Sequence, residues 1–499
     1  MKSKLNISNR TSRVLLGFGV TLALIQYLSG RSVWMDEAKL AFNIMDRSYL
    51  ELLQPLDSVQ VAPILFLWIQ KFFYNLLGAH DWVFRLLPLL AFLVSCLVLY
   101  KLLHALRLKN QAISVATSLF AFCQPLIYYA SEIKQYEVDV MVGLVIMYAV
   151  VRTYSSKRNE LLTLSLVGMF AVGLSNISVI MLFVGGLYYW FGVYRKTGRW
   201  VNHSVIPIAL WAITFLGYYV AFIHNHPTPD FMAPYWKDFA YMPWNVFSAD
   251  FWAFWWRSYE IIFGKIMGVN PKIPLLFHVF GVAYVLGIYS FWKLKRRRLL
   301  FLLVAPFLVH IFLSALELYP FVQRVGQYLQ PMFAIVCAQG FVFGTKLLTQ
   351  KTNVSQFKYA LILPGLVMLA ITLYTFPKDR EEFKESYEFM LSRKRTKDQI
   401  LTNSGADNAW YYYEKIGYIK PEVRRIISDF NRYNFEGHHQ QLDGLSGRIW
   451  FLISHDFYDS KRKMLESEYM LEYLKKRGGV VLESDENIGS SVYLIELPE

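Results

Sequence analysis

Two adjacent carboxylates, Asp36 and Glu37, follow the first apolar segment of the chain within the run Trp34-Met-Asp-Glu. A carboxylate beside the membrane could act as a general base that accepts the proton of an attacking hydroxyl group. An Asp-Glu pair also suits the first turn of a helix, because negative charge interacts favourably with the helix dipole there. The local sequence leaves both interpretations open.

Two further clusters of ionisable residues lie at the ends of apolar segments. Charged side chains at such positions are candidates for function, because burying them in lipid is costly. The alternative is that the basic residues are ordinary anchors whose charged ends extend to the membrane surface. The clusters are Tyr128-Tyr-Ala-Ser-Glu132-Ile-Lys134-Gln-Tyr136-Glu137-Val-Asp139 and Glu317-Leu-Tyr319-Pro-Phe-Val-Gln-Arg324.

The composition indicates that membrane-spanning helices carry these clusters. Of the 499 residues, 55% are apolar and only 18% are charged, whereas typical soluble domains have roughly 45–50% and about 25%. These values argue against a soluble multidomain protein and against a disordered chain. The three cysteines lie in apolar stretches without a C-x-x-C pair, so neither a disulfide scaffold nor a zinc site is indicated.

Eleven segments are apolar and close to the length of about 20 residues that a helix needs to cross a bilayer. The first is not followed by an A-x-A-like cleavage site, so we expect an uncleaved anchor. The predicted spans are 14–29, 86–104, 112–129, 138–154, 161–176, 178–194, 203–222, 274–292, 299–316, 326–345 and 358–376.

The basic residues predict how these spans are oriented. The net charge of +14 divides into +17 for residues 1–376 and −3 for residues 377–499, which disfavours a nucleic-acid-binding face. With the N-terminus in the cytoplasm, 21 of the 32 basic residues of 1–376 lie on inner connections, as the positive-inside rule requires. On the same assignment 14 of its 15 acidic residues lie outside, which favours chemistry on the outer face.

Two domains are predicted, a transmembrane domain over 1–376 and a soluble extracytoplasmic domain over 377–499. The transmembrane domain has two long outer loops, 30–85 and 223–273, and the second is rich in Trp and Phe. The amphipathic stretch 63–77 would invert every later span if it crossed the membrane, so we expect it to lie in the outer interface. The tail has alternating patterns that predict a small α/β domain. Its expected elements are strands at 448–453, 479–482 and 491–496 and a helix at 460–476.

Five motifs in the same order give the chain a family resemblance over roughly residues 10–345. The chain resembles the family-39-type membrane glycosyltransferases of the GT-C superfamily, which include protein O-mannosyltransferases and lipid A aminoarabinose transferases. The tail lies outside this resemblance. The motifs are Trp34-x-Asp-Glu37, Val61-Ala-Pro-Ile-Leu-Phe-Leu-Trp68, Arg85-Leu-Leu-Pro88, Ser131-Glu-Ile-Lys-Gln-Tyr136 and Tyr319-Pro-Phe…Arg324.

The resemblance implies a GT-C fold with about 11 transmembrane helices and an inverting glycosyltransferase. Such enzymes move a hexosyl or pentosyl group from a polyprenyl-phosphate donor to an acceptor on the outer face of the membrane. The acceptor is an unidentified glycan, lipid or protein. By analogy Asp36 would be the general base, and Glu37 would orient Asp36 or the acceptor.

A lipid-phosphate donor needs positive side chains where phosphate charge develops in the transition state. Lys134 and Arg324 are the first candidates and Arg85 is the third. Arginine can bind phosphate through two parallel hydrogen bonds, whereas lysine acts as a point charge. Tyr136, Glu132 and Tyr319 are candidate substrate-binding residues, although many of the 33 tyrosines must serve packing alone.

No D-x-D run lies on the predicted cytoplasmic side, which favours a lipid-linked donor over a nucleotide sugar. The sequence indicates no cofactor and no protein-bound metal, and it leaves a divalent cation open. His224-x-His226 could contribute to a structural zinc site, but two histidines without a third ligand are more typical of polar surface.

The main alternative function is a non-catalytic transporter or flippase of lipid-linked sugars. Such a protein should carry charges near the bilayer midplane in repeated halves, and no repeat is evident. A polymerase or ligase of outer glycans is a third hypothesis. The predicted location is the bacterial inner or plasma membrane, with the N-terminus cytoplasmic and the C-terminal domain outside.

Overall fold

The computed structural model describes residues 2–155, 160–224, 236–237, 239–270, 272–352, 355–426, 439–460 and 462–498. Residues 225–235 of the aromatic loop, which include His226, and two inner cations, Lys157 and Arg158, lie outside these residues. The chain divides into two compact units. The first comprises Met1–Leu28, Ser48–Phe72 and Arg85–Pro377, and the second comprises Ser29–Arg47, Phe73–Phe84 and Lys378–Glu499.

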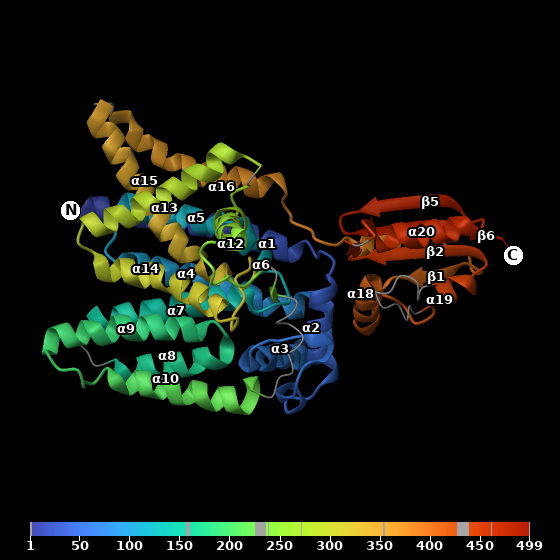
Figure 1. Cartoon of the computed structure of the whole chain (residues 1–499), viewed down its shortest axis with the longest axis horizontal. Helices are drawn as coiled ribbons and strands as arrows, with labels where there is room; N and C mark the ends of the chain where they lie inside the picture. The colour runs from blue at the N-terminus through green and yellow to red at the C-terminus, as the bar shows by residue number, and fades with distance from the viewer. Residues whose placement is uncertain are drawn as a thin grey trace. The chain divides into compact units, whose positions relative to one another are not determined.

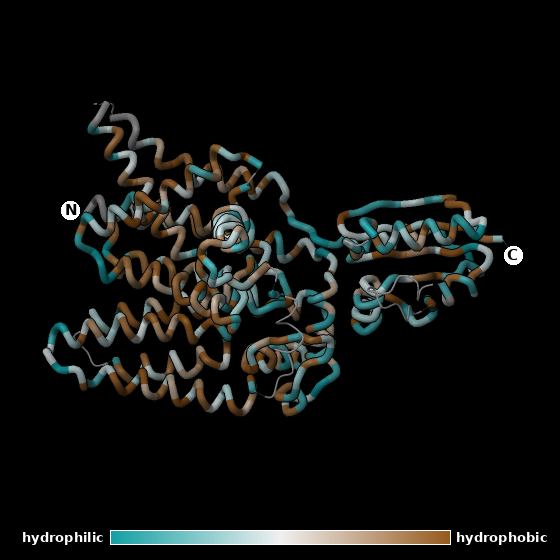
Figure 2. Tube along the Cα trace, in the orientation of Figure 1, coloured by the Kyte–Doolittle hydropathy of each residue, from teal (hydrophilic) through white to brown (hydrophobic). Residues whose placement is uncertain are grey.

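The first unit is a bundle of helices (Figure 1). The middle parts of these helices are mainly hydrophobic, and their ends are mostly hydrophilic (Figure 2). Two of its helices, α3 and α4, begin or end in the second unit. The helices are α1 (Lys2–Leu28), α3 (Ile64–Leu77), α4 (Asp81–Ala105), α5 (Asn110–Ala121), α6 (Gln124–Tyr129), α7 (Tyr136–Ser155), α8 (Leu161–Leu174), α9 (Ser178–Thr197), α10 (Val205–Tyr218), α12 (Ala249–Tyr259), α13 (Pro274–Lys293), α14 (Arg297–Ala315), α15 (Gln330–Thr352) and α16 (Leu363–Tyr374).

Each of the eleven predicted spans coincides with helix in the structure. Seven helices within the described residues are long and apolar enough to cross a membrane, and three shorter apolar helices accompany them. The predicted span 112–129 is interrupted at Phe122 and Cys123, and α6 begins with Pro125 in its first turn, where a missing N–H group is tolerated. The predicted fold class, a polytopic helical membrane protein with a C-terminal α/β domain, is confirmed.

Two helices of the bundle, α13 and α15, approach each other very closely. A Cβ atom on Gly340 would lie 1.7 Å from the carbonyl oxygen of Ala283, and one on Gly287 would lie 2.0 Å from that of Val336. No side chain fits at these separations. Small residues let helix backbones meet in membranes, where packing drives association.

The second unit contains a four-stranded sheet in the order β1-β2-β6-β5. Strand β2 pairs in parallel with β1 and antiparallel with β6, and Trp450 lies opposite Leu494. Met470 and Leu474 of α20 pack with alternate residues of β2 in a buried core. The elements are β1 (Gln399–Thr402), β2 (Gly447–Ser454), β3 (Tyr458–Asp459), β4 (Met464–Leu465), β5 (Val480–Asn487), β6 (Ser490–Leu497), α2 (Met35–Asp46), α17 (Phe383–Arg393), α18 (Ser404–Lys415), α19 (His439–Asp443) and α20 (Glu466–Lys476).

The three strands predicted for the tail are confirmed as β2, β5 and β6. The helix predicted over 460–476 is confirmed as α20 from Glu466 onward, whereas Met464–Leu465 form strand β4. Strand β1 and helix α18 were not predicted. The structure also groups residues 29–47 and 73–84 of the first predicted outer loop with the tail.

Replacing Gly340 with Ala should destabilise the protein by about 1–3 kcal/mol, because an added methyl group overfills a tight contact. Gly217→Ala is the matched control, since nothing lies within 4 Å of a Cβ at this position of α10. Removing an exposed helical glycine should leave the stability unchanged or raise it slightly. Thermal unfolding of the purified proteins in detergent measures both variants, and equal shifts would contradict the close packing of α13 and α15.

Candidate functional site

A buried ion pair fixes the start of α2, the helix that carries the first carboxylates. Arg31 donates two hydrogen bonds to the Glu37 carboxylate, at 2.8 and 3.0 Å. The two side chains are only 1% and 0% exposed. The same carboxylate accepts the backbone N–H of Trp34 at 3.3 Å, which satisfies one of the amides that a helix start leaves without a partner.

Asp36 and Glu37 therefore occupy different environments although they are neighbours in the sequence. Successive residues of a helix point about 100° apart, so the two carboxylates cannot face the same way. Glu37 is fully buried in its pair with Arg31, whereas Asp36 is only partly buried in the first turn of α2. Of the two, Asp36 is the one that a substrate can reach more readily.

Helix α2 packs on helix α18 of the C-terminal tail, within the second unit. The backbone N–H of Val33 donates to the Tyr413 hydroxyl at 2.8 Å, just before the helix begins. At the other end of α2, Lys415 pairs with Asp46 at 2.9 Å. Both ends of the segment that carries Asp36 therefore contact residues nearly 400 positions later in the chain.

The tail also holds the start of α4. The Asp81 carboxylate accepts hydrogen bonds from Lys384 at 2.6 Å and from the Tyr412 hydroxyl at 2.8 Å. An aspartate in the first turn suits the positive end of the helix dipole. Arg85 lies one turn later on the same helix and is buried.

In the first unit, three of the predicted residues lie near Tyr129, the last residue of α6, and a fourth lies near one of those three. Glu132, Tyr136 and Arg324 lie within electrostatic range of Tyr129, and the rings of Tyr129 and Tyr136 are 5.2 Å apart. Tyr319 lies within the same range of Tyr136. Two clusters that are about 180 residues apart in the sequence therefore meet in space.

Lys134 belongs to the same irregular segment between α6 and α7. It is almost fully buried, and its Nζ atom donates to the Gln60 side-chain oxygen at 2.5 Å. Arg85 lies within electrostatic range of Tyr27, in the last turn of α1.

Tyr319 is positioned by His310 of α14. One nitrogen of His310 lies 3.1 Å from the Pro320 carbonyl oxygen, and its ring lies 5.2 Å from that of Tyr319 at an interplanar angle of 57°. Burial raises the pKa of Tyr319 well above its usual value, and Asp139 and Tyr136 add to this effect. The phenol therefore stays protonated and can donate a hydrogen bond to an anion.

The structure adds Glu137 and Asp139 to the site, two residues without a role in the sequence-based hypothesis. Both are buried in the first turns of α7. Asp139 accepts a hydrogen bond from the Ser175 hydroxyl at 2.5 Å, and Glu137 lies beside Ser95 of α4. The sequence already indicated a possible role for them, since carboxylates at the start of an apolar span are candidates for function.

Among the residues that the structure describes, histidines, cysteines and carboxylates do not gather into a metal-binding group. Within the residues that the structure describes, no three such side chains lie close enough to hold a metal ion. His438 lies outside those residues, and His439 of α19 hydrogen-bonds the Tyr469 hydroxyl at 2.8 Å.

Comparison with known proteins links one segment of the chain to a family. Two solved structures are similar, both of ArnT from Cupriavidus metallidurans, one in the apo state and one bound to undecaprenyl phosphate. They share 11% and 10% identity with this chain, cover 95% of it and 97% of their own length, and have TM-scores of 0.49 and 0.47. A search of the curated proteins found no match. Residues 61–224 match the model of the dolichyl-phosphate-mannose-protein mannosyltransferase family, so the resemblance to membrane glycosyltransferases is confirmed over this segment.

Proposed function

We propose that this protein is an inverting glycosyltransferase that uses a polyprenyl-phosphate-linked sugar and transfers it to an acceptor on the outer face of the membrane. The observation that carries the proposal is the family match over residues 61–224. This segment includes Lys134, Glu132 and Tyr136. Ionisable residues gathered at the ends of apolar helices support it, because charged side chains in membrane segments are costly and occur mainly where they function.

In the proposed reaction the acceptor hydroxyl attacks the anomeric carbon from the side opposite the phosphate. The bond between this carbon and the phosphate oxygen breaks, and the lipid phosphate leaves with the electron pair. Asp36 accepts the hydroxyl proton as a general base, which requires an ionised and accessible carboxylate. Its partial exposure in the first turn of α2 meets the second condition.

Glu37 serves this reaction by positioning Asp36. Its carboxylate is committed to Arg31 and to the Trp34 amide, so a proton transfer there would break the start of α2. Of the two sequence-based roles for Glu37, orienting Asp36 is the one that these contacts support.

Lys134, Arg324 and Arg85 are the proposed phosphate ligands. A cation stabilises the transition state most when its position is set in advance and water is excluded. Lys134 meets this requirement through its burial and its bond to Gln60. Arg324 is half-buried and lies within electrostatic range of Tyr129. Tyr319 can add a neutral hydroxyl donor.

A transporter or flippase of lipid-linked sugars would leave the bond between the sugar and the phosphate intact. The two functions are therefore separated by following a labelled polyprenyl-phosphate sugar with the purified protein in lipid vesicles. Release of the lipid phosphate, or label on an acceptor, supports transfer. Movement of intact donor between leaflets without cleavage supports the alternative.

Asp36→Asn should lower the rate of sugar transfer by about 10²–10⁴-fold, because it removes a general base while keeping the side chain's size. Asp46→Asn is the matched control, since it makes the same change at the far end of the same helix. An exposed ion pair such as that of Asp46 with Lys415 contributes little, so this control should keep its activity. Equal transfer by Asp36→Asn and the wild type would remove Asp36 from the role of base.

Glu37→Gln should destabilise the protein by about 3–5 kcal/mol, because it leaves Arg31 buried without its charge partner. Replacing both partners, as Arg31→Met with Glu37→Leu, should recover much of that loss. Thermal unfolding and sugar transfer are measured on the same samples. A Glu37→Gln variant that melts like the wild type but does not transfer sugar would show that Glu37 takes part in the chemistry.

Lys134→Gln and Arg324→Gln should each raise the KM for the donor by about 10-fold or more, because each removes a charged hydrogen bond to phosphate. The KM for the acceptor should change little. Lys272→Gln is the control, since this exposed lysine follows α12 outside the cluster. An unchanged donor KM in both variants would exclude these residues as phosphate ligands.

A further inference from the structure

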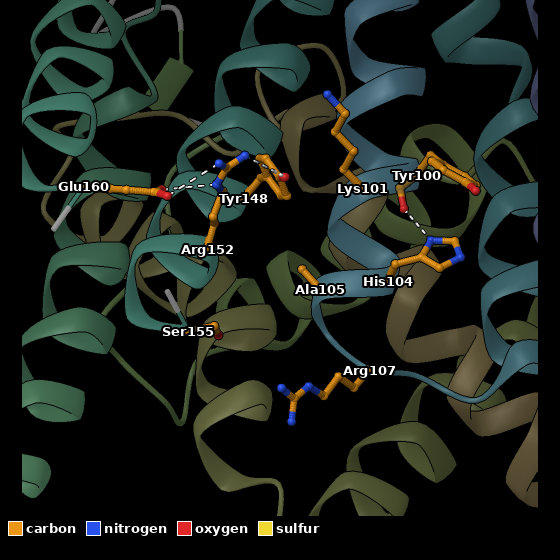
Figure 3. A pocket seen from close by; sticks show the side chains of 9 residues that line it. All are labelled: Tyr100, Lys101, His104, Ala105, Arg107, Tyr148, Arg152, Ser155 and Glu160. Carbon is orange, nitrogen blue, oxygen red and sulfur yellow. Dashed lines mark hydrogen bonds and ion pairs between the residues drawn. The ribbon is translucent and has the colours of Figure 1, made fainter. Parts of the chain in front are cut away.

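A cavity of about 700 Å³ lies between the C-terminal ends of α4 and α7. Its lining includes three cations, Lys101, Arg107 and Arg152, and one carboxylate, Glu160 (Figure 3). The volume is typical of ligand pockets, which measure roughly 300–1,000 Å³. The lining therefore combines the size of a binding site with an excess of positive charge.

Only one of the three cations is neutralised within the described residues. Arg152 pairs with Glu160 at 3.1 Å and reaches the Tyr148 hydroxyl (Figure 3). Lys101 and Arg107 are exposed and make no ion pair with the described part of the chain. The cavity thus presents two positive charges to an incoming group.

The turn after α4 is held in place by a fourth cation, Arg296. Its guanidinium donates to the carbonyl oxygens of Leu106 and Arg107. Arg107 has a φ of +51°, a left-handed conformation that a non-glycine residue adopts only when its surroundings impose it. The structure thereby holds the Arg107 backbone at the cavity and brings additional positive charge near it.

The cavity is separate from the proposed donor site. Lys101 lies 16 residues after Arg85 on α4, and Arg152 lies 16 residues after Tyr136 on α7. A rise of 1.5 Å per residue places these pairs roughly 24 Å apart along their helices. The cavity and the Tyr129 cluster therefore lie at opposite ends of the bundle.

An apolar stripe on α4 leads to the cavity. Leu90, Val94 and Leu97 are 40%, 38% and 52% exposed, and the exposed Lys101 follows. Steps of four, three and four residues place these four side chains on one face of the helix. A lipid whose acyl chain lies along this stripe would have its headgroup at Lys101.

We propose that the cavity binds the phosphate headgroup of an anionic glycerophospholipid. The continuity of the stripe with the cavity favours a lipid over a free phosphate. The C-terminal end of a helix repels anions, so the affinity must come from the side chains. Basic pockets between transmembrane helices bind anionic headgroups in this way. The bound lipid would tie α4 to α7 at the end of the bundle that the positive-inside rule assigns to the cytoplasm.

The test measures lipid binding to the purified full-length protein in detergent by native mass spectrometry. Phosphatidylglycerol should bind more tightly than phosphatidylcholine, and inorganic phosphate at equal concentration should not displace it. The double variant Lys101→Gln with Arg107→Gln should bind phosphatidylglycerol about 25-fold more weakly, at about 5-fold for each cation. Arg195→Gln removes an exposed cation from the last turn of α9, outside the cavity, and should bind like the wild type.

Equal binding of phosphatidylglycerol by the double variant and the wild type would overturn the proposal. Displacement by inorganic phosphate would overturn the lipid as the ligand. Sugar transfer is assayed in parallel, and the double variant should retain its donor KM because neither residue is a proposed phosphate ligand of the donor. A binding loss with an unchanged donor KM separates this cavity from the proposed catalytic function.

Discussion

The buried pair of Arg31 and Glu37 is the interaction on which the geometry of the candidate base depends. Two charges removed from water carry a large desolvation cost, and their attraction recovers it only with good geometry and further hydrogen bonds. The pair meets both conditions through its two short contacts and the Trp34 amide. A helix start fixed in this way leaves α2 one orientation, and that orientation keeps Glu37 inside and Asp36 partly accessible.

The C-terminal tail also helps to hold the segments around the candidate base. The chain before α2 is held by the Tyr413 hydroxyl, and the start of α4 is held by Lys384 and Tyr412. All three residues lie beyond the segment that matches the glycosyltransferase family. Contacts with the tail can hold the segment of the candidate base without any lengthening of the membrane helices. The family resemblance alone gives no indication of this support.

Hydropathy and alternation predicted the membrane helices and the three longest strands, β2, β5 and β6, because those patterns are local. The tail strands and the helix over 64–77 follow directly from them. The grouping of residues 29–47 with the tail could not be predicted in the same way, since pairs such as Val33 and Tyr413 are 380 residues apart and leave no periodic signal. Helix α18 was missed because its Trp410-Tyr-Tyr-Tyr413 run resembles a strand. The different environments of Asp36 and Glu37 follow from the helical period. The sequence alone left open whether these residues begin a helix, and the structure shows that they lie in the first turn of α2.

Basic residues at the helix ends can serve membrane orientation or anion binding. The number of charges in the sequence does not distinguish these two roles. Membrane orientation requires only an excess of Lys and Arg on one side, and any arrangement of those residues satisfies it. Lys101 and Arg107 come from the end of α4 and Arg152 from the end of α7, and nevertheless they meet around one cavity. Orientation does not require this convergence, whereas binding an anion does, because the attraction between charges falls with distance and with screening by salt. Membrane orientation therefore does not explain why these cations share a cavity, whereas anion binding does. The sequence does not reveal the cavity, because it forms only where the folded chain brings the ends of α4 and α7 together.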